Sequence, residues 1–404
     1  MYERFVARQP IFDQHLEVFG YELLFRAGRE NGISRSEHAT AHVIVDSTML
    51  LRLDQLIGPG RAFLNMTPEE IRGGSAFLLS NTKTVIELSE PPNADHDTIL
   101  ACQNLQQSGY QLALDGFRDI SRWKPLLPFA SFLKVDFRTT SGDEQQAIAK
   151  SFTGAGLKLI GKRIESREEF AHASKYGYSM FQGFFFLRPQ IVVARDLPAG
   201  KLNCLRLLRE TAASQLRYDE IERILKQEPS LLYKLLRYLN SPALGLSREV
   251  RSVPYALTLL GEKEFRRWVS VVAVVAASAD EPVELLRSAL VRAYFCEGLS
   301  ALLQGGRVSG EFFLLGLLSL MDVLFRRPMR EILEDLPISA DICTALLGGT
   351  GPFRDVLEAA LAYETADWDR FHEVAERARL DQLMAAEKYE AAVLQASSLH
   401  QQAS

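Results

Sequence analysis

Through the first half of the chain, short apolar runs each end in a polar residue, and helix-like stretches separate most of these runs. Runs rich in Leu, Ile, Val and Phe that alternate with helices predict parallel βα units. The polar residues that follow the runs are Glu22, Asn65, Glu87, Asp115, Lys134, Glu165 and Gln182. Because every strand brings a polar side chain to its C-terminal end, we expect a (β/α)8 barrel with one convergent site.

From about residue 200 the pattern changes to apolar stripes at helical spacing, with few strand signals. Pro198 and Gly200 mark the change, since both residues interrupt regular structure. We therefore predict a barrel domain over 1–197 and an all-helical domain over 200–390. Residues 391–404 are expected to form a polar C-terminal tail, with the small, polar residues 396–404 frayed.

Composition narrows the class of protein. The net charge of -5 predicts neither nucleic acid nor an anionic membrane as a partner. Four widely spaced cysteines fit buried thiols in a reducing compartment. The N-terminus resembles no export signal, and the longest apolar stretch, Trp268–Ala277, is too short to span a bilayer. We expect a cytoplasmic protein.

The strand ends carry motifs that resemble the EAL domain, a bacterial (β/α)8 barrel, over about the first 195 residues. Glu22–Arg26 stands where the signature Glu-Ala-Leu-x-Arg would be, and Lys134–Asp136 matches Lys-Ile-Asp. The other matching segments are Gln9–Ile11, Phe63–Pro68, Ile86–Glu90, Asp115–Phe117 and Phe181–Pro189. Their order and spacing support the barrel.

The resemblance implies hydrolysis of cyclic di-GMP, with two Mg²⁺ or Mn²⁺ ions that bind oxygen ligands and activate a water. By the same resemblance, Lys134 and Glu165 would serve catalysis, Lys134 by orienting the attacking water. The nucleotide would be contacted by three side chains, Gln9, Arg26 and Gln182. The first ion would be held at four strand ends, by Glu22, Asn65, Glu87 and Asp115.

The second-ion side departs from the family pattern. Gly116 replaces a second Asp, and Lys162 replaces a Glu, with Arg163 beside it. An ammonium about 5 Å from a divalent ion costs roughly 6 kcal/mol at an effective dielectric near 20. We therefore predict no two-ion centre, and Lys162 within salt-bridge reach of Asp115 or Glu165. Whether one Mg²⁺ or Mn²⁺ remains, or the lysines alone neutralise the acids, stays open.

The second half resembles the HDOD domain, a helical relative of the HD phosphohydrolases. Leu235–Pro242 and Ala256–Gly261 match its motifs, and Gly316–Asp322 falls where an active HD protein has its His-Asp dyad. Here the dyad reads Ser319–Leu320, and no histidine occurs between His172 and His372. HD catalysis needs several histidines and aspartates on metal, so this half is expected to be inactive.

Three functions follow for an EAL–HDOD protein. The leading one is a non-catalytic signal-transduction protein that needs no cofactor and acts on other signalling proteins through either domain, as a monomer or an oligomer. The second is a weakly active cyclic di-GMP phosphodiesterase. The third is a receptor that binds cyclic di-GMP without hydrolysing it.

Overall fold

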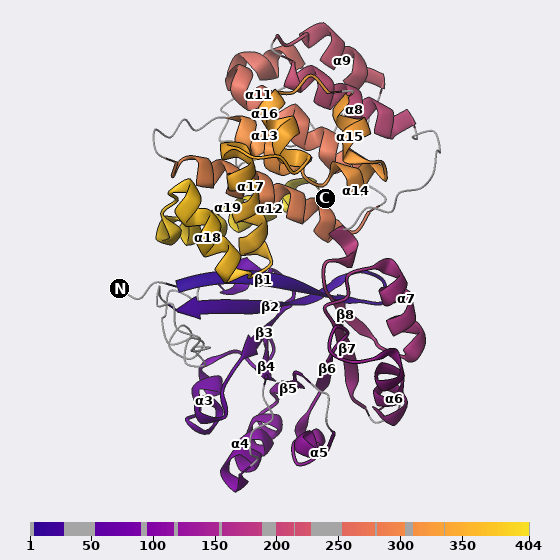
Figure 1. The fold of residues 1–404 in the computed structure, drawn as a ribbon, viewed down its shortest axis with the longest axis vertical. Helices are drawn as coiled ribbons and strands as arrows, with labels where there is room; N and C mark the ends of the chain where they lie inside the picture. The colour runs from indigo at the N-terminus through magenta and orange to yellow at the C-terminus, as the bar shows by residue number, and fades with distance from the viewer. Residues whose placement is uncertain are drawn as a thin grey trace. The chain divides into compact units, whose positions relative to one another are not determined.

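The structure, a computed structural model, describes residues 4–27, 53–89, 95–116, 120–152, 156–187, 199–213, 215–227, 253–278, 281–303, 310–334 and 336–403 (Figure 1). It divides into two compact units that separate near residue 188. The predicted domain boundaries stay a prediction. The motif segment Leu235–Pro242 lies outside the described residues.

The first unit is a closed eight-stranded barrel in which consecutive strands are neighbours, as the sequence predicted. The strands are β1 (Arg4–Asp13), β2 (Val18–Ala27), β3 (Arg61–Asn65), β4 (Thr84–Leu88), β5 (Gln111–Leu114), β6 (Phe132–Asp136), β7 (Lys158–Lys162) and β8 (Met180–Gln182). From β2 to β8 every pair is parallel.

The first strand differs from the predicted all-parallel arrangement. β1 pairs antiparallel with both β2 and β8, so it closes the barrel while running opposite to the other seven strands. The physical reason is the connection between β1 and β2, which spans only Gln14–Glu17. A parallel pair needs a crossover of about a dozen residues, whereas an antiparallel pair needs only a short turn.

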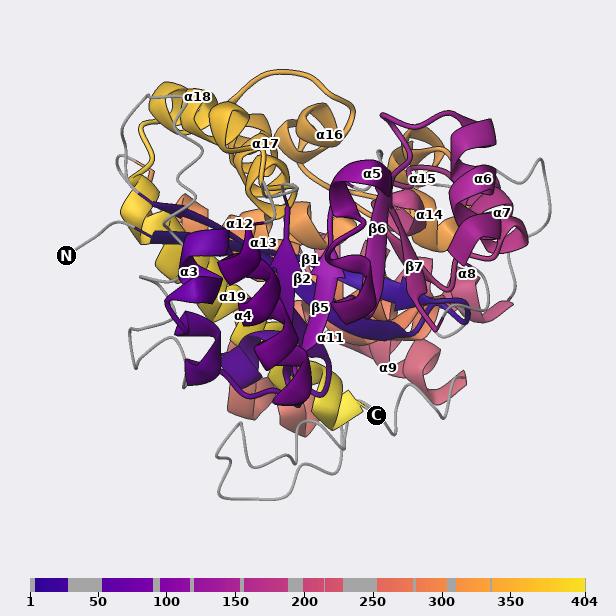
Figure 2. The same ribbon diagram turned by 90° about the horizontal axis from the view of Figure 1, so that it is seen from below.

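Helices lie outside the ring of strands (Figure 2). They begin at polar caps: Thr67 forms a capping box with Glu70, and Asp95 and Ser166 each accept a bond from a first-turn amide. The helical elements are α3 (Pro68–Arg72), η1 (Ser75–Leu78), α4 (His96–Gln107), α5 (Ile120–Trp123), η2 (Leu127–Phe129), α6 (Gly142–Phe152), α7 (Arg167–Tyr176) and η3 (Phe185–Leu187). The ends of the strands are therefore available to form a site.

The second unit is helical throughout its described residues, as predicted. Its elements are α8 (Ala199–Ala212), α9 (Tyr218–Gln227), α11 (Val253–Ala277), α12 (Val283–Ser300), α13 (Gly310–Leu318), α14 (Met321–Phe325), α15 (Met329–Glu334), α16 (Ala340–Leu346), α17 (Pro352–Glu364), α18 (Trp368–Ala378) and α19 (Gln382–Ala403). Gly261, at φ 73°, interrupts α11. None of the described helices is long and apolar enough to cross a lipid bilayer.

The expectation of a separate polar tail over 391–404, frayed from Ala396 onward, was wrong. Helix α19 continues through this segment to Ala403. Ala392, Val393 and Ala396 are buried, and α19 packs along α12. This apolar stripe within a polar-looking segment stabilises the helix.

Candidate functional site

Strand geometry aims the predicted residues into the barrel. A layer of apolar side chains, with Phe63, Val85, Ala113, Phe132, Ile160 and Met180 among its members, fills the barrel core. Because side chains two positions apart in a strand point to the same face, the next inward residue of each strand lies in one layer above that core. These next residues are Asn65, Glu87, Asp115, Lys134, Lys162 and Gln182.

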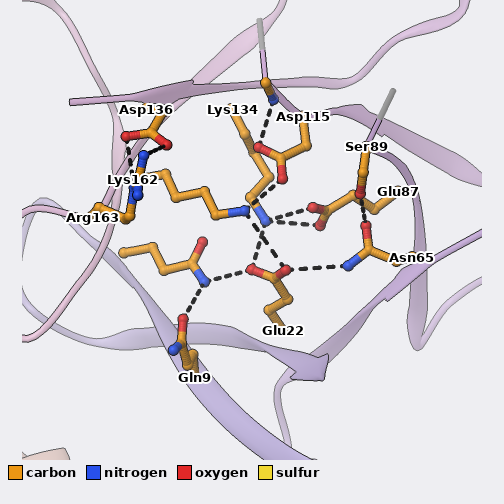
Figure 3. A network of polar contacts seen from close by, with 12 residues as sticks. Gln9, Glu22, Asn65, Glu87, Ser89, Asp115, Lys134, Asp136, Lys162 and Arg163 are labelled. Atoms are coloured by element: carbon orange, nitrogen blue, oxygen red, sulfur yellow. Dashed lines mark hydrogen bonds and ion pairs between the residues drawn. The ribbon is translucent and has the colours of Figure 1, made fainter. Parts of the chain in front are cut away.

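Lys134 lies at the centre of this layer and is fully buried (Figure 3). Its Nζ donates to Glu22 Oε2 and to both carboxylate oxygens of Glu87, at 2.8 Å in each case. Glu22 and Glu87 are also buried. A buried ammonium keeps its charge only beside such carboxylates, so the three residues form one ionic unit.

Lys162 reaches the same cluster from the neighbouring strand. Its Nζ lies 2.5 Å from Asp115 Oδ2 and 4.0 Å from Glu22 Oε1. Figure 3 shows the ammonium directed at both carboxylates. The side chain of Lys162 is 23% exposed, against 9% for Asp115. The predicted salt bridge between Lys162 and Asp115 is therefore confirmed, and Lys162 lies at the more open side of the cluster.

Glu22 connects the amide side chains to the lysines. Its carboxylate accepts from Gln182 Nε2 at 2.5 Å and from Asn65 Nδ2 at 3.2 Å. Gln182 also donates to Gln9 Oε1 at 3.1 Å, while its own Oε1 is buried without a hydrogen-bond partner among the described residues. The register places Gln9 directly opposite Glu22. The structure thus brings together most of the predicted residues.

The charges shift one another's pKa values. Burial by itself would raise the pKa of Glu22 and of Asp115, but Lys134 and Lys162 outweigh burial and lower both. Burial and the neighbouring Glu22 raise the pKa of Glu87 to about 8. Burial opposes the charge of each lysine, yet the carboxylates raise both lysine pKa values. At neutral pH the cluster therefore holds two ammonium groups, two carboxylates and one protonated Glu87.

We expect Glu87→Gln to remove a pH dependence of stability. The folded protein keeps the Glu87 proton up to about pH 8, whereas a carboxyl of ordinary pKa 4.5 loses it earlier. Stability therefore falls as pH rises through this interval, by at most about 1.4 kcal/mol per pH unit. The lowered pKa values of Glu22 and Asp115 act only at lower pH.

Thermal melts at pH 5.5 and 7.5 check this expectation. The wild-type protein should lose stability between the two pH values, and Glu87→Gln should lose about 2–3 kcal/mol less. Exposed Glu168, changed to Gln, is the matched control and should follow the wild type. If all three proteins lost stability equally between the two pH values, Glu87 would not hold a proton in the folded state.

Other predicted residues lie outside the cluster. Glu165 is half-exposed, 3.5 Å from Arg138 Nε. Arg163, at φ 59°, is exposed and paired with Asp136, so it adds no charge to the cluster. Gly116, at φ 67°, offers only its backbone amide, which donates to Asp115 Oδ1. The side chain of Arg26 lies outside the described residues.

Two residues of the site had no role assigned from the sequence. Ser89 donates to Asn65 Oδ1 and so fixes the amide that faces Glu22. Asp136 pairs with Arg163 and turns that guanidinium away from the cluster. Both residues lie two positions after a site residue, Glu87 or Lys134. The period of two along a strand was therefore the available signal.

The helical unit contains no comparable acidic site among its described residues. The three carboxylates of Glu22, Glu87 and Asp115 form the one group that could hold a metal ion in the described part of the chain. Ser319 Oγ accepts from buried Arg292 at 2.9 Å, and Leu320 is buried. A guanidinium thus faces the position where an active HD protein would have its dyad.

Comparisons with known proteins agree with this two-unit arrangement. Residues 197–329 match the HDOD domain family. A Vibrio cholerae protein named cyclic di-GMP phosphodiesterase CdgJ is 31% identical over 373 residues, 91% of this chain and 86% of its own. The uncharacterised Bacillus subtilis protein YuxH is 30% identical over 380 residues, 92% and 93% of the two chains. Among solved structures, the Bacillus subtilis protein YkuI, which has an EAL domain, was solved in complex with cyclic di-GMP and calcium. It is 16% identical to this chain, with a TM-score of 0.39, over 64% of this chain and 73% of its own.

Proposed function

The chain belongs to the EAL–HDOD family of two-domain proteins, and from this premise we propose that it is a cyclic di-GMP signalling protein whose barrel does not hydrolyse the nucleotide. The observation that carries this proposal is the place of Lys162. Its ammonium lies 2.5 Å from Asp115 and 4.0 Å from Glu22, among the carboxylates that a metal ion would need. A cation built into the chain takes the place of a cation from solution.

The residues present do not fit a two-ion centre. Both oxygens of Glu87 accept from Lys134, and each oxygen of Asp115 already accepts a hydrogen bond. Gly116 provides no side-chain oxygen. The three carboxylates have ligand atoms within 4.8 Å of one another, which suits one divalent ion, but only after Lys162 leaves Asp115. Two ammonium groups and a dication would then repel one another.

The side-chain amides of Gln9 and Gln182 at the end of the barrel support binding of a nucleotide without hydrolysis. Gln9 and Gln182 are held together by a hydrogen bond, and Gln182 keeps a buried oxygen without a partner among the described residues. A buried acceptor of this kind is available to a donor on a ligand. The nucleotide would then act as a signal, and other signalling proteins would respond through either domain.

Incubation of the purified protein with cyclic di-GMP and Mn²⁺ tests the proposal. We expect no linear dinucleotide by chromatography, since the second-ion ligands are missing. The double variant Gly116→Asp with Lys162→Glu restores two carboxylates, and it should bind Mn²⁺ more tightly and gain hydrolysis. Asp tolerates the left-handed backbone at position 116 better than most residues do. Efficient turnover by the wild-type protein would overturn the non-catalytic proposal.

A second candidate function is weak phosphodiesterase activity. It is favoured by the intact trio of Glu22, Glu87 and Asp115 and by the name of the Vibrio cholerae relative. Calorimetry with the same nucleotide separates the outcomes: heat with linear product selects the phosphodiesterase, and heat without product selects a receptor. If neither heat nor linear product is detected, the protein acts through its protein partners alone.

A further inference from the structure

The helical unit contains a cavity of about 580 Å³ that the barrel chemistry does not use. It lies among the end of α8, the second part of α11, and the first turns of α13 and α16. Its lining includes the apolar side chains of Phe313, Leu314 and Ile342, with Phe313 and Ile342 buried. A cavity of this size with a few polar groups on apolar walls is typical of sites for small organic molecules.

Arg267 gives the cavity a fixed polar group. Its guanidinium lies 4.2 Å from the ring centroid of Phe313 and 4.6 Å from that of Tyr294. One nitrogen, Nη1, pairs with Glu297 at 2.9 Å. In the described part of the chain, Nε and Nη2 of Arg267 form no hydrogen bond. The two rings and the carboxylate thus fix the plane of the guanidinium, and its Nε and Nη2 edge is left to donate to a ligand.

The other charged groups of the lining decide the charge of the ligand. Arg266 is occupied by Glu262 and by the backbone oxygen of Thr211. Glu311, in the first turn of α13, and Lys263, at the rim, are both exposed, so water screens both charges. The group left for a ligand is therefore the donor edge of Arg267.

We propose that this cavity binds a small organic anion. The apolar part of the ligand lies against Phe313, Leu314 and Ile342, and its carboxylate, sulfonate or phosphate accepts from the free edge of Arg267. The ligand would give the helical unit an input of its own, independent of the nucleotide proposed for the barrel.

Anilinonaphthalene sulfonate is a suitable probe, because it joins aromatic rings to one anionic group and fluoresces when it leaves water. Titration of the full-length protein should give one saturable site. Arg267→Lys keeps the charge but loses the planar fork, and it should weaken binding about tenfold. Leu314→Trp should fill the cavity and abolish binding. Arg370→Lys, in a surface ion-pair network with Glu358 and Glu373, is the matched control and should bind like the wild type.

The uncharged dye phenylnaphthylamine separates an anion site from a merely apolar one. We expect it to bind at least about tenfold more weakly than the sulfonate, since it makes no bond to Arg267. Circular dichroism establishes that each variant is folded, and the two variants act through different groups, so a failure of one leaves the other. Equal affinity of both dyes, or sulfonate binding that Leu314→Trp leaves unchanged, would overturn the proposal.

Discussion

Lys134→Met should destabilise the barrel by about 3–5 kcal/mol at neutral pH, the cost of leaving buried charges without their partner. The methionine fills similar volume, but Glu22 loses a hydrogen bond and Glu87 loses two. Neither carboxylate is exposed to water, so solvent cannot replace those bonds. The remaining relief is protonation, which becomes easier in acid, and the loss should therefore shrink at pH 5.

Urea denaturation followed by circular dichroism measures this effect. Exposed Lys150, changed to Met, is the matched control and should stay within about 0.5 kcal/mol of the wild type. Combining Lys134→Met with Glu22→Gln should recover part of the loss, because the buried carboxylate that depended on the ammonium is then absent. A Lys134→Met barrel as stable as the wild type would mean that the lysine is not the central counter-ion.

Lys162→Ala should lower stability by about 2 kcal/mol and make it responsive to Mn²⁺. The cost is smaller than for Lys134 because the side chain is 23% exposed, and water can reach Asp115 once the ammonium is gone. Removing the ammonium also frees oxygens of Asp115 and Glu22 for a metal ion. Each tenfold of Mn²⁺ above its dissociation constant should then add about 1.4 kcal/mol.

The matched control for this variant is the neighbouring Arg163→Ala. Arg163 is exposed and pairs with Asp136, outside the carboxylate cluster, so its removal should leave the response to Mn²⁺ unchanged. Thermal melts with and without Mn²⁺ should show a rise in melting temperature for Lys162→Ala alone. An equal rise for the wild-type protein would mean that Lys162 does not exclude the ion.

Much of the site could be predicted because, in a barrel, the position of a residue along its strand determines at which end of the barrel its side chain lies. Each polar residue that follows an apolar run lies at the same end of the barrel, whatever its neighbours are. The inward direction of Lys162 also follows, since Ile160 two positions before it is a core residue.

The features that could not be predicted depend on contacts between segments distant in sequence. Arg163 turns outward because Asp136 of the adjacent strand receives it, and an interaction between side chains 27 positions apart leaves no local pattern. The raised pKa of Glu87 likewise depends on burial and on Glu22, which a different strand brings to it. The helical end of α19 could not be predicted from composition, because Ala392, Val393 and Ala396 form an apolar face only once the segment is helical.

The pairing of the first strand with the last has a consequence for how the chain is made. β1 is synthesised first, yet its pairing with β8 joins Ile11 to Gln182 and Phe12 to Phe181. The ring cannot close until the ribosome has released the last strand, and closing so large a loop is slow. Glu22 receives its bond from Gln182 only at that moment. Until then the edges of the growing sheet are unpaired, and unpaired edges can join strands of other chains.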